Sequence, residues 1–298
     1  MTRPFDLGRV GIWTGVLDAV PSKEATAIAA RIEEMGFPTL WIPETVGRDP
    51  FVSAALILGA TSTLRVATGI ANIYARDAVT MANTQRTLEE AFPGRFLLGL
   101  GVSHHHLVDR VRHHAYDKPY SRMVEYLDAM DQAVFRAVGP AERSATVLAA
   151  LGPKMLRLAG ERADGAHPYF VPVEHTAQAR ELLGPDPILA PEQMVVLDAD
   201  PSRARETARK GMSVYLRAPN YVNNLKRYGF TDDDVADGGS ERLVDAIVAC
   251  GGVDEVVARV RAHFEAGASH VCVQVLGADP TAVPESGWRE LAAGLGEV

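Results

Sequence analysis

Five histidines lie in a short segment that follows an apolar run. The run covers residues 96–101, and the histidines after it are His104, His105, His106, His113 and His114. An imidazole gains or loses a proton near neutral pH, so such a side chain can act as an acid or a base. Imidazole also binds metals, but adjacent histidines cannot all face one point, and metal sites in barrels usually draw carboxylates from several strands. We therefore predict no metal site, and either a solvent-exposed loop or one reactive histidine.

A second candidate site is a glycine–proline turn that leads into a helix. Ala150 ends an expected strand, and Leu151, Gly152, Pro153 and Lys154 follow it. Proline at the first helical position leaves free backbone N–H groups that point at the preceding loop. These groups, the helix dipole and the ammonium group of Lys154 all favour a bound anion. The segment predicts a phosphate or carboxylate site, although the same turn also occurs as a plain structural connection.

Three other expected strands also end in residues that suit a binding site. Trp13 ends the first strand, Glu44 and Thr45 follow the second, and Gly69 lies at the end of the third. Glu44 can exchange a proton or form a salt bridge, and Trp13 can line a substrate site or fill the core. Glycine at a strand end lets the backbone kink and lets a flat ligand approach closely.

These residues follow segments that are expected to form buried strands. The expected strands cover residues 9–14, 39–43, 64–70, 96–101, 145–150, 165–170, 193–197 and 270–275. Helical periodicity predicts helices over residues 22–35, 49–58, 78–91, 120–138, 153–160, 201–216, 220–228 and 253–265, with Ser22 as the first N-cap and a polar loop over 231–240.

Near-continuous apolar strands that alternate with helices require a parallel sheet covered by helices. About eight strands favour a closed α/β fold, the (β/α)8 TIM barrel, as a single domain over residues 1–298. Because active sites of such barrels lie at the carboxyl ends of the strands, the candidate residues above are expected to meet at one mouth.

Composition narrows the classes of function. A net charge of −8 argues against nucleic acid as a partner, because phosphate backbones require a basic face. No apolar run approaches the roughly 18 residues of a membrane helix, and the N-terminus has no signal-peptide pattern. Two cysteines give no disulfide framework, so we expect a cytoplasmic protein. Arginine outnumbers lysine 25 to 5, which is typical of GC-rich bacteria and mildly favours an actinobacterial host.

Two motifs together resemble a known family. The sequence Thr-Gly-Ile at residues 68–70, followed after a helix by Pro-Gly-Arg-Phe-Leu-Leu-Gly-Leu-Gly-Val-Ser at residues 93–103, is similar to the bacterial luciferase-like superfamily. Within it, the deazaflavin-dependent oxidoreductases are the nearest match. The resemblance implies a TIM barrel that binds coenzyme F420 or a flavin at its mouth. It also implies a non-prolyl cis peptide between Gly69 and Ile70, behind the ring.

The same resemblance assigns cofactor contacts. The ring is expected to touch Glu44, Gly69, Ile70, Ala71, Gly101, Val102 and Ser103. The phosphate is expected at Ala150, Leu151, Gly152, Pro153 and Lys154, and the pattern of residues 159–165 supports that alignment. The resemblance assigns no contact to Lys226 and Arg227, which lie on a later expected helix. They can meet an acidic substrate or the cofactor tail, but we include neither in the predicted site.

Catalytic roles follow from positions that match the family. Glu44 occupies a position where relatives place an acidic residue against the ring, and His104 one where they often carry a catalytic glutamate. Thr45 stands where several relatives have an acid–base histidine, which departs from their pattern. Glu44 and His104 are therefore the expected catalytic residues, and Trp13 and Thr45 are expected to contact the substrate.

The expected function is F420-dependent hydride transfer to or from a small organic substrate, by a homodimer. One alternative is an FMN-dependent luciferase-like monooxygenase with a similar ring site. A second is a non-catalytic barrel that binds a flavin or nothing, and a metal-dependent hydrolase is the most remote. The sequence does not identify the substrate.

Overall fold

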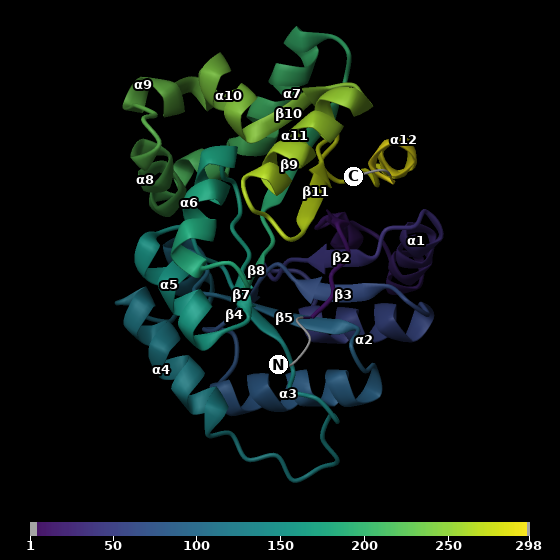
Figure 1. The fold of residues 1–298 in the computed structure, drawn as a ribbon, viewed down its shortest axis with the longest axis vertical. Coiled ribbons are helices and arrows are strands. Elements are labelled where there is room, and N and C mark those ends of the chain that lie inside the picture. The colour runs from purple at the N-terminus through teal and green to yellow at the C-terminus, as the bar shows by residue number, and fades with distance from the viewer. Residues whose placement is uncertain (1–4, 297–298) are drawn as a thin grey trace.

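The strands form one parallel sheet, and the helices lie around it (Figure 1). The computed structural model describes residues 5–296, so the ends of the predicted domain, residues 1–4 and 297–298, lie outside it. Strand neighbours follow the order β10-β9-β11-β1-β2-β3-β5-β6-β7-β8, with β4 paired to β5. The strands are β1 (Val10–Trp13), β2 (Thr39–Ile42), β3 (Arg65–Thr68), β4 (Ala71–Asn72), β5 (Phe96–Gly101), β6 (Thr146–Leu148), β7 (Gly165–Ala166), β8 (Ile188–Leu189), β9 (Glu192–Leu197), β10 (Val248–Gly251) and β11 (Val271–Val275).

The barrel closes through β8 and β9, which are two parts of one interrupted strand. β8 pairs with β7, and β9 pairs with β11, which in turn pairs with β1. The interruption lies at Ala190 and Pro191, because proline has no N–H group for the ladder. The carbonyl of Pro191 still accepts a hydrogen bond from the Cys272 N–H group over 3.1 Å. This closure confirms the predicted TIM barrel.

A small apolar cluster fills the barrel. Trp13, Trp41, Ala67, Leu97 and Cys272 belong to it, and Trp41 is completely buried. Side chains alternate between the two faces of a strand, so the other face packs against the helices in a larger core. The packed interior leaves the chemistry to the loops at the carboxyl ends of the strands.

Helices surround the sheet, with α3 and α4 at one end of the view and α7, α9 and α10 at the other (Figure 1). None of the helices in the described part of the chain is both long and apolar enough to cross a membrane. The helices are α1 (Ser22–Glu34), α2 (Pro50–Ala60), α3 (Ala78–Ala91), α4 (Pro119–Asp131), α5 (Pro153–Arg162), α6 (Val173–Leu183), α7 (Pro201–Met212), α8 (Pro219–Arg227), α9 (Asp232–Val235), α10 (Glu241–Ile247), α11 (Val253–Glu265) and α12 (Glu285–Leu295).

Aspartates begin several of these helices. The carboxylate of Asp49 accepts from two N–H groups in the first turn of α2, and that of Asp77 accepts from the Thr80 N–H group over 2.9 Å. Such caps satisfy backbone donors that have no partner inside the helix. The prediction of Ser22 as an N-cap was wrong: Pro21 takes that position, and no side chain caps α1.

Several predicted boundaries were wrong. The helix expected over 120–138 ends at Asp131, because Val134 and Val138 are 66 % and 80 % exposed and no core faces them. The expected polar loop over 231–240 contains α9, which begins with a capping box between Thr231 and Asp234. Strands β4, β8 and β10 and helices α6, α10 and α12 were not predicted, and β4 and β8 are each only two residues long.

Candidate active site

The peptide bond between Gly69 and Ile70 is cis, which confirms the family-based prediction. Both residues are half-buried, so the segment is partly open to solvent just beyond β3. A Cβ atom on Gly99 would lie 2.0 Å from the carbonyl oxygen of Thr68, and one on Gly101 would lie 2.5 Å from Cδ1 of Ile70. The missing side chains of these two glycines leave room for the end of β3 and for the cis peptide that follows it. The contact of Gly101 with the cofactor ring stays a prediction.

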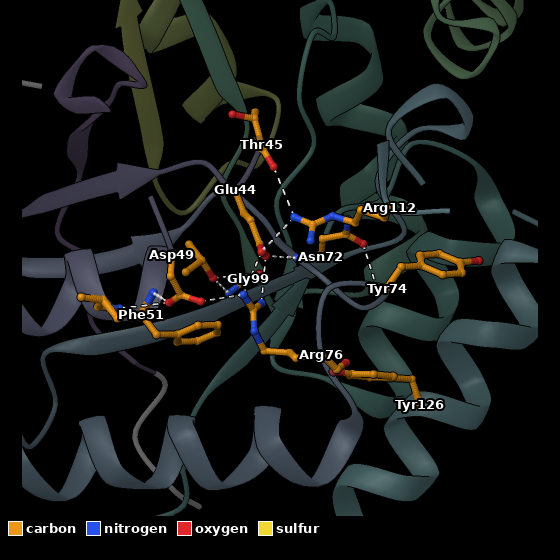
Figure 2. Close-up of polar contacts among 12 residues, drawn as sticks. Glu44, Thr45, Asp49, Phe51, Asn72, Tyr74, Arg76, Gly99, Arg112 and Tyr126 are labelled. Atoms are coloured by element: carbon orange, nitrogen blue, oxygen red, sulfur yellow. Dashed lines mark hydrogen bonds and ion pairs between the residues drawn. The ribbon is translucent and has the colours of Figure 1, made fainter. Parts of the chain in front are cut away.

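Glu44 lies in an ion-pair network (Figure 2). Arg76 donates to its two carboxylate oxygens over 2.9 and 2.7 Å, and Arg112 donates to one of them over 3.3 Å. The Asn72 N–H group donates over 2.8 Å, so the carboxylate also fixes strand β4. Only 6 % of the Glu44 side chain is exposed. Glu44 therefore forms a salt bridge, which was one of the two roles expected from the sequence. Its catalytic role and its contact with the cofactor ring stay predictions.

The arginines of this network are themselves held from several elements. Arg76 also pairs with Asp49 at 3.0 Å. The Tyr126 hydroxyl donates to the backbone carbonyl of Arg76 over 2.9 Å. Arg112 also donates to the carbonyl of Thr45 over 3.2 Å. The Thr45 side chain is exposed, so the predicted substrate contact lies at the rim of the network.

His104 is half-buried at the start of the segment after β5. Burial lowers the pKa of its imidazole, the nearby His106 lowers it further, and the Asn220 side chain opposes the shift. Its Nδ1 atom is buried without a hydrogen-bond partner, and its ring lies 5.4 Å from that of Tyr221. Ser103 before it has a φ of 56°, which turns the chain away from the strand. The proton-transfer role of His104 stays a prediction.

The other histidines of the cluster do not converge with His104 on a common point. His105 and His106 are exposed. Among residues 5–296, no group of three or more histidine, cysteine, aspartate or glutamate side chains is arranged to hold a metal ion.

The glycine–proline turn forms a basic site at the N-terminus of α5. Gly152 is the N-cap and Pro153 the first helical residue. Arg227 from α8 reaches this turn: its Nη1 atom lies 3.0 Å from the position of a Cβ atom on Gly152. Lys154 is exposed beside it. The helix dipole and the two cations therefore favour an anion here.

A buried histidine fixes the loop in front of that helix. The Nε2 atom of His175 donates to the carbonyl of Leu151 over 2.9 Å. Burial lowers the pKa of His175 to about 4, so its ring is neutral at pH 7. The sequence analysis missed this role, because His175 lies in a helix that was not predicted.

Trp13 and Tyr169 form an aromatic wall beside Gly69. Trp13 is 7 % exposed, and its ring lies 5.1 Å from that of Tyr169. The Tyr169 hydroxyl lies 2.6 Å from the hydroxyl of Tyr215 and 2.7 Å from Oε1 of Gln274. These contacts bring the exit of β7, the segment before α8 and strand β11 to the predicted substrate residue Trp13.

His167 was also missed, although it lies inside the barrel beside the same wall. The residue is 1 % exposed, and its ring stacks on Trp41 at a centroid distance of 4.2 Å. The predicted strand over 165–170 ends at Ala166, so His167 lies on the irregular exit of that strand. A histidine inside a predicted barrel strand was the available signal.

Glu192 is a buried carboxyl group on β9. Burial raises its pKa to about 8, so it is mostly protonated at pH 7. Its Oε2 atom accepts from the Phe170 N–H group over 3.3 Å. Phe170 has a φ of 58°, so this contact lies at the turn that directs Tyr169 toward Trp13.

The predicted residues fall into neighbouring groups. Gly69 lies beside Trp13, and Ile70 packs on Gly101. Val102 is half-buried, whereas Ala71 and Ala150 are buried. The cofactor contacts assigned to these residues stay predictions.

Comparisons with known proteins agree with this architecture. The family model for luciferase-like monooxygenases matches residues 5–270. A 5,10-methylenetetrahydromethanopterin reductase from Methanolobus tindarius is 26 % identical over 86 % of this chain and 92 % of that protein.

Two solved structures share the fold. An F420-dependent secondary alcohol dehydrogenase in complex with an F420-acetone adduct has a TM-score of 0.77 and 16 % identity, over 96 % of this chain and 97 % of that one. A coenzyme F420-dependent tetrahydromethanopterin reductase from Methanopyrus kandleri has a TM-score of 0.75 and 18 % identity, over 96 % and 98 %. With its family model matched from residue 5 to residue 270, the chain belongs to the luciferase-like monooxygenase family.

Proposed function

We propose that this protein is a coenzyme F420-dependent oxidoreductase that transfers a hydride between the deazaflavin and a small organic substrate. The observation that carries the proposal is the basic site at Gly152, where Arg227 and Lys154 flank a helix N-terminus. Neither cation forms a salt bridge within residues 5–296, in a chain whose net charge is −8. An anionic cofactor tail fits this site.

The partly exposed Gly69–Ile70 segment supports a ring site at the same mouth. The residues that would hold the ring are Glu44, Gly69, Ile70, Ala71, Gly101, Val102 and Ser103. Residues 150–154 would hold the phosphate. When bound, the deazaflavin supplies two-electron hydride chemistry. The names of the two solved structures described above, both F420-dependent enzymes, are consistent with this assignment.

His104 would handle the proton that accompanies the hydride. Its half-buried ring and its lowered pKa leave a neutral imidazole at pH 7, which can accept a proton. Glu44 would contact the ring at the mouth of the barrel and take part in catalysis. Arg76 and Arg112 hold its carboxylate in place.

We also propose that the protein is a cytoplasmic homodimer that does not bind nucleic acid or membranes. Apolar side chains are exposed on neighbouring helices: Val52 is 60 % and Leu56 is 46 % exposed on α2, and Val79 is 47 % exposed on α3. A second copy that covers this face would remove them from water. Both cysteines are free, which suits a reducing compartment. Light scattering after size exclusion checks the dimer.

A binding titration tests the cofactor assignment. We expect F420 to bind with a dissociation constant in the micromolar range or below, and FMN to bind more weakly. Arg227→Ala should weaken F420 binding by roughly 10- to 150-fold, because a charge-assisted hydrogen bond contributes about 1.5–3 kcal/mol. The matched control is Lys226→Ala, since Lys226 already pairs with Asp232 at 2.6 Å. Binding of FMN without binding of F420 would instead favour the monooxygenase alternative.

A further inference from the structure

The sheet has a free edge at β10, away from the residues assigned to the cofactor. β10 pairs with β9 on one side, and none of the described strands pairs with its other side. The Val248 side chain packs in the cluster that contains Ala204 of α7, and the Ala249 side chain packs in the cluster that contains Val256 of α11. Side chains alternate between the two faces of a strand, so α7 and α11 lie on opposite faces of the sheet. Figure 1 shows the three elements together at one end of the molecule.

A groove of about 850 Å³ runs along this edge. Its volume lies within the range of about 300–1,000 Å³ that is usual for binding clefts. Cys250 of β10, Ala204 of α7 and Ala258 of α11 are among the residues that line it, so both helices reach past the edge strand. A second sheet that approaches β10 meets these helices first, whereas a single extended chain can enter between them.

The backbone of Cys250 faces the groove. The Asp198 N–H group, which continues β9, donates to the carbonyl of Gly251 over 3.1 Å, so the backbone of Gly251 points at β9. The groups of successive strand residues point to opposite sides, so the N–H group and the carbonyl of Cys250 point away from β9. Within residues 5–296, neither of these two groups has a hydrogen-bond partner. The edge therefore presents one free donor and one free acceptor.

An added antiparallel strand satisfies both groups at once. In such a pair, one residue of the new strand exchanges two hydrogen bonds with the residue opposite, here Cys250. Parallel pairing is slightly less stable per residue, which favours the antiparallel direction. Recognition by strand addition draws its affinity from these main-chain bonds and its specificity from alternate side chains. The side chains that line the groove therefore indicate which sequence fits.

Two opposite charges lie on the α11 wall of the groove. Glu255 is exposed, and its Oε2 atom accepts from the Gly252 N–H group over 2.9 Å, near the end of β10. Arg259 donates to the carbonyls of Asp245 and Ala246 over 2.6 and 2.9 Å, near the start of β10. In the described part of the chain, neither side chain forms a salt bridge. The wall is thus acidic at one end of β10 and basic at the other.

The spacing of these charges matches that of a strand. Glu255 and Arg259 are four residues apart on a helix, which corresponds to a rise of about 6 Å. Alternate residues of a strand are about 6.8 Å apart and point to the same face. The residues of an added strand opposite Ala249 and Gly251 share the α11 face with Ala249. One of them therefore lies against Arg259 and the other against Glu255.

We propose that the edge of β10 binds an extended segment of a partner protein as an antiparallel strand. Its order is a basic residue against Glu255, a small residue opposite Cys250 and an acidic residue against Arg259. The small residue faces α7, where Ala204 lines the groove. None of the residues assigned to the cofactor or the substrate lines this groove, so the proposal is independent of the proposed function.

The first experiment measures peptide binding by fluorescence anisotropy. The probe is a labelled peptide Val-Lys-Ala-Glu-Val with blocked ends, and we expect saturable binding. The matched control is Val-Glu-Ala-Lys-Val, which has the same composition with the charges exchanged. It should bind about tenfold more weakly, because two exposed ion pairs that contribute up to about fivefold each are replaced by like charges.

Variants of α11 test which wall the peptide contacts. Glu255→Gln should weaken binding about 2- to 5-fold, the range of an exposed ion pair. Its control is Asp254→Asn, because Asp254 is exposed on the same helix and does not line the groove. Ala258→Trp should abolish binding by filling the groove, whereas Arg261→Trp, on the same helix outside the lining, should leave it unchanged. Circular dichroism checks that each variant is folded.

The second experiment reports on the edge itself. The chain has two cysteines, so isotope labelling of cysteine nitrogen gives two amide signals, and Cys250→Ser assigns them. We expect the Cys250 amide to exchange rapidly with deuterium in the free protein. At a peptide concentration ten times the dissociation constant it should exchange about tenfold more slowly, since only about one-eleventh of the protein is then free. The Cys272 amide, which donates to the carbonyl of Pro191 over 3.1 Å, should exchange slowly throughout.

Four results would overturn the proposal. The first is that neither peptide binds, and the second is that both bind equally. The third is that the peptide binds without slowing exchange at Cys250, which would place it elsewhere on the surface. The fourth is slow exchange at Cys250 in the free protein, which would show that the edge is already covered. If that protection increases with protein concentration, the occupant is a second copy of the chain.

Discussion

Arg76 and Glu44 form a bidentate ion pair at the end of β2, with Nη1–Oε2 and Nη2–Oε1 distances of 2.9 and 2.7 Å. Only 12 % of the Arg76 side chain and 6 % of the Glu44 side chain are exposed. The pair joins the end of β2 to the segment between β4 and α3. The second of these segments follows the cis peptide at Gly69–Ile70 in the chain.

Removal of Arg76 should destabilise the fold. Arg76→Ala leaves the Glu44 carboxylate with Arg112 and one backbone donor, so we expect a loss of about 3 kcal/mol, as for other buried pairs that lose one partner. Urea denaturation measures the change in the free energy of unfolding. The control is Arg122→Ala, because Arg122 pairs with Asp117 and Glu125 on the surface, where a pair contributes about 0–1 kcal/mol. Equal losses in the two variants would contradict a structural role for the buried pair.

Two glycines should respond to alanine in opposite directions. Gly99→Ala places a methyl group 2.0 Å from the backbone carbonyl of Thr68, so β5 and β3 must separate, and we expect a loss of about 1–3 kcal/mol or more. Gly59 lies inside α2 with no atom within 4 Å of an added Cβ, so Gly59→Ala should stabilise the fold by about 0.5–1 kcal/mol. Thermal unfolding monitored by circular dichroism compares them. A Gly99→Ala variant as stable as the parent would show that the two strands have room.

Acid should weaken the fold before most carboxylates titrate. Burial lowers the pKa of His167, His175 and His270 to about 4 and that of His263 to about 3, from an unfolded value of 6.5. The unfolded chain thus binds protons that the folded chain does not. The resulting stability is present above pH 6.5 and is lost as pH falls toward 4. Denaturation midpoints measured at pH 7.5, 6.5 and 5 should fall more in the second interval than in the first, and a constant midpoint would contradict neutral buried rings.

Glu192 should have the opposite dependence. Its folded pKa, raised to about 8 by burial, exceeds the unfolded value of 4.5, so its contribution is full below pH 4.5 and is lost as pH rises through 8. Glu192→Gln is uncharged throughout, so its stability relative to the parent should increase by up to about 1.4 kcal/mol per pH unit between pH 5 and 8. Urea titrations at those pH values measure the difference. A pH-independent difference would indicate that Glu192 is ionised in the fold.

The barrel could be predicted because its determinants are local in sequence. The boundaries of α3 agree with the prediction at both ends, since Asp77 caps it and apolar residues recur along it. Strand β8 was missed because Pro191 interrupts the run after two paired residues.

The site was predicted less completely, because its contacts join distant residues. Glu44 was identified from its place after a strand, but its partners Arg76 and Arg112 lie 32 and 68 residues further along the chain. His167 was passed over because residues 165–170 were expected to be strand throughout. The left-handed turn at Phe170 and the contact of its N–H group with Glu192 depend on β9, which the local pattern does not contain.

The close packing of Gly101 on Ile70 has a consequence for how this mouth changes during evolution. The Ile70 side chain occupies the space that a side chain at position 101 would need. A Cβ atom at position 101 would lie only 2.5 Å from Cδ1 of Ile70. The sizes of residues 70 and 101 are therefore complementary. A bulkier residue at position 101 requires a smaller one at position 70, and the reverse. Substitutions at the two positions should therefore covary among homologous sequences, and a library that diversifies this mouth should vary them as a pair.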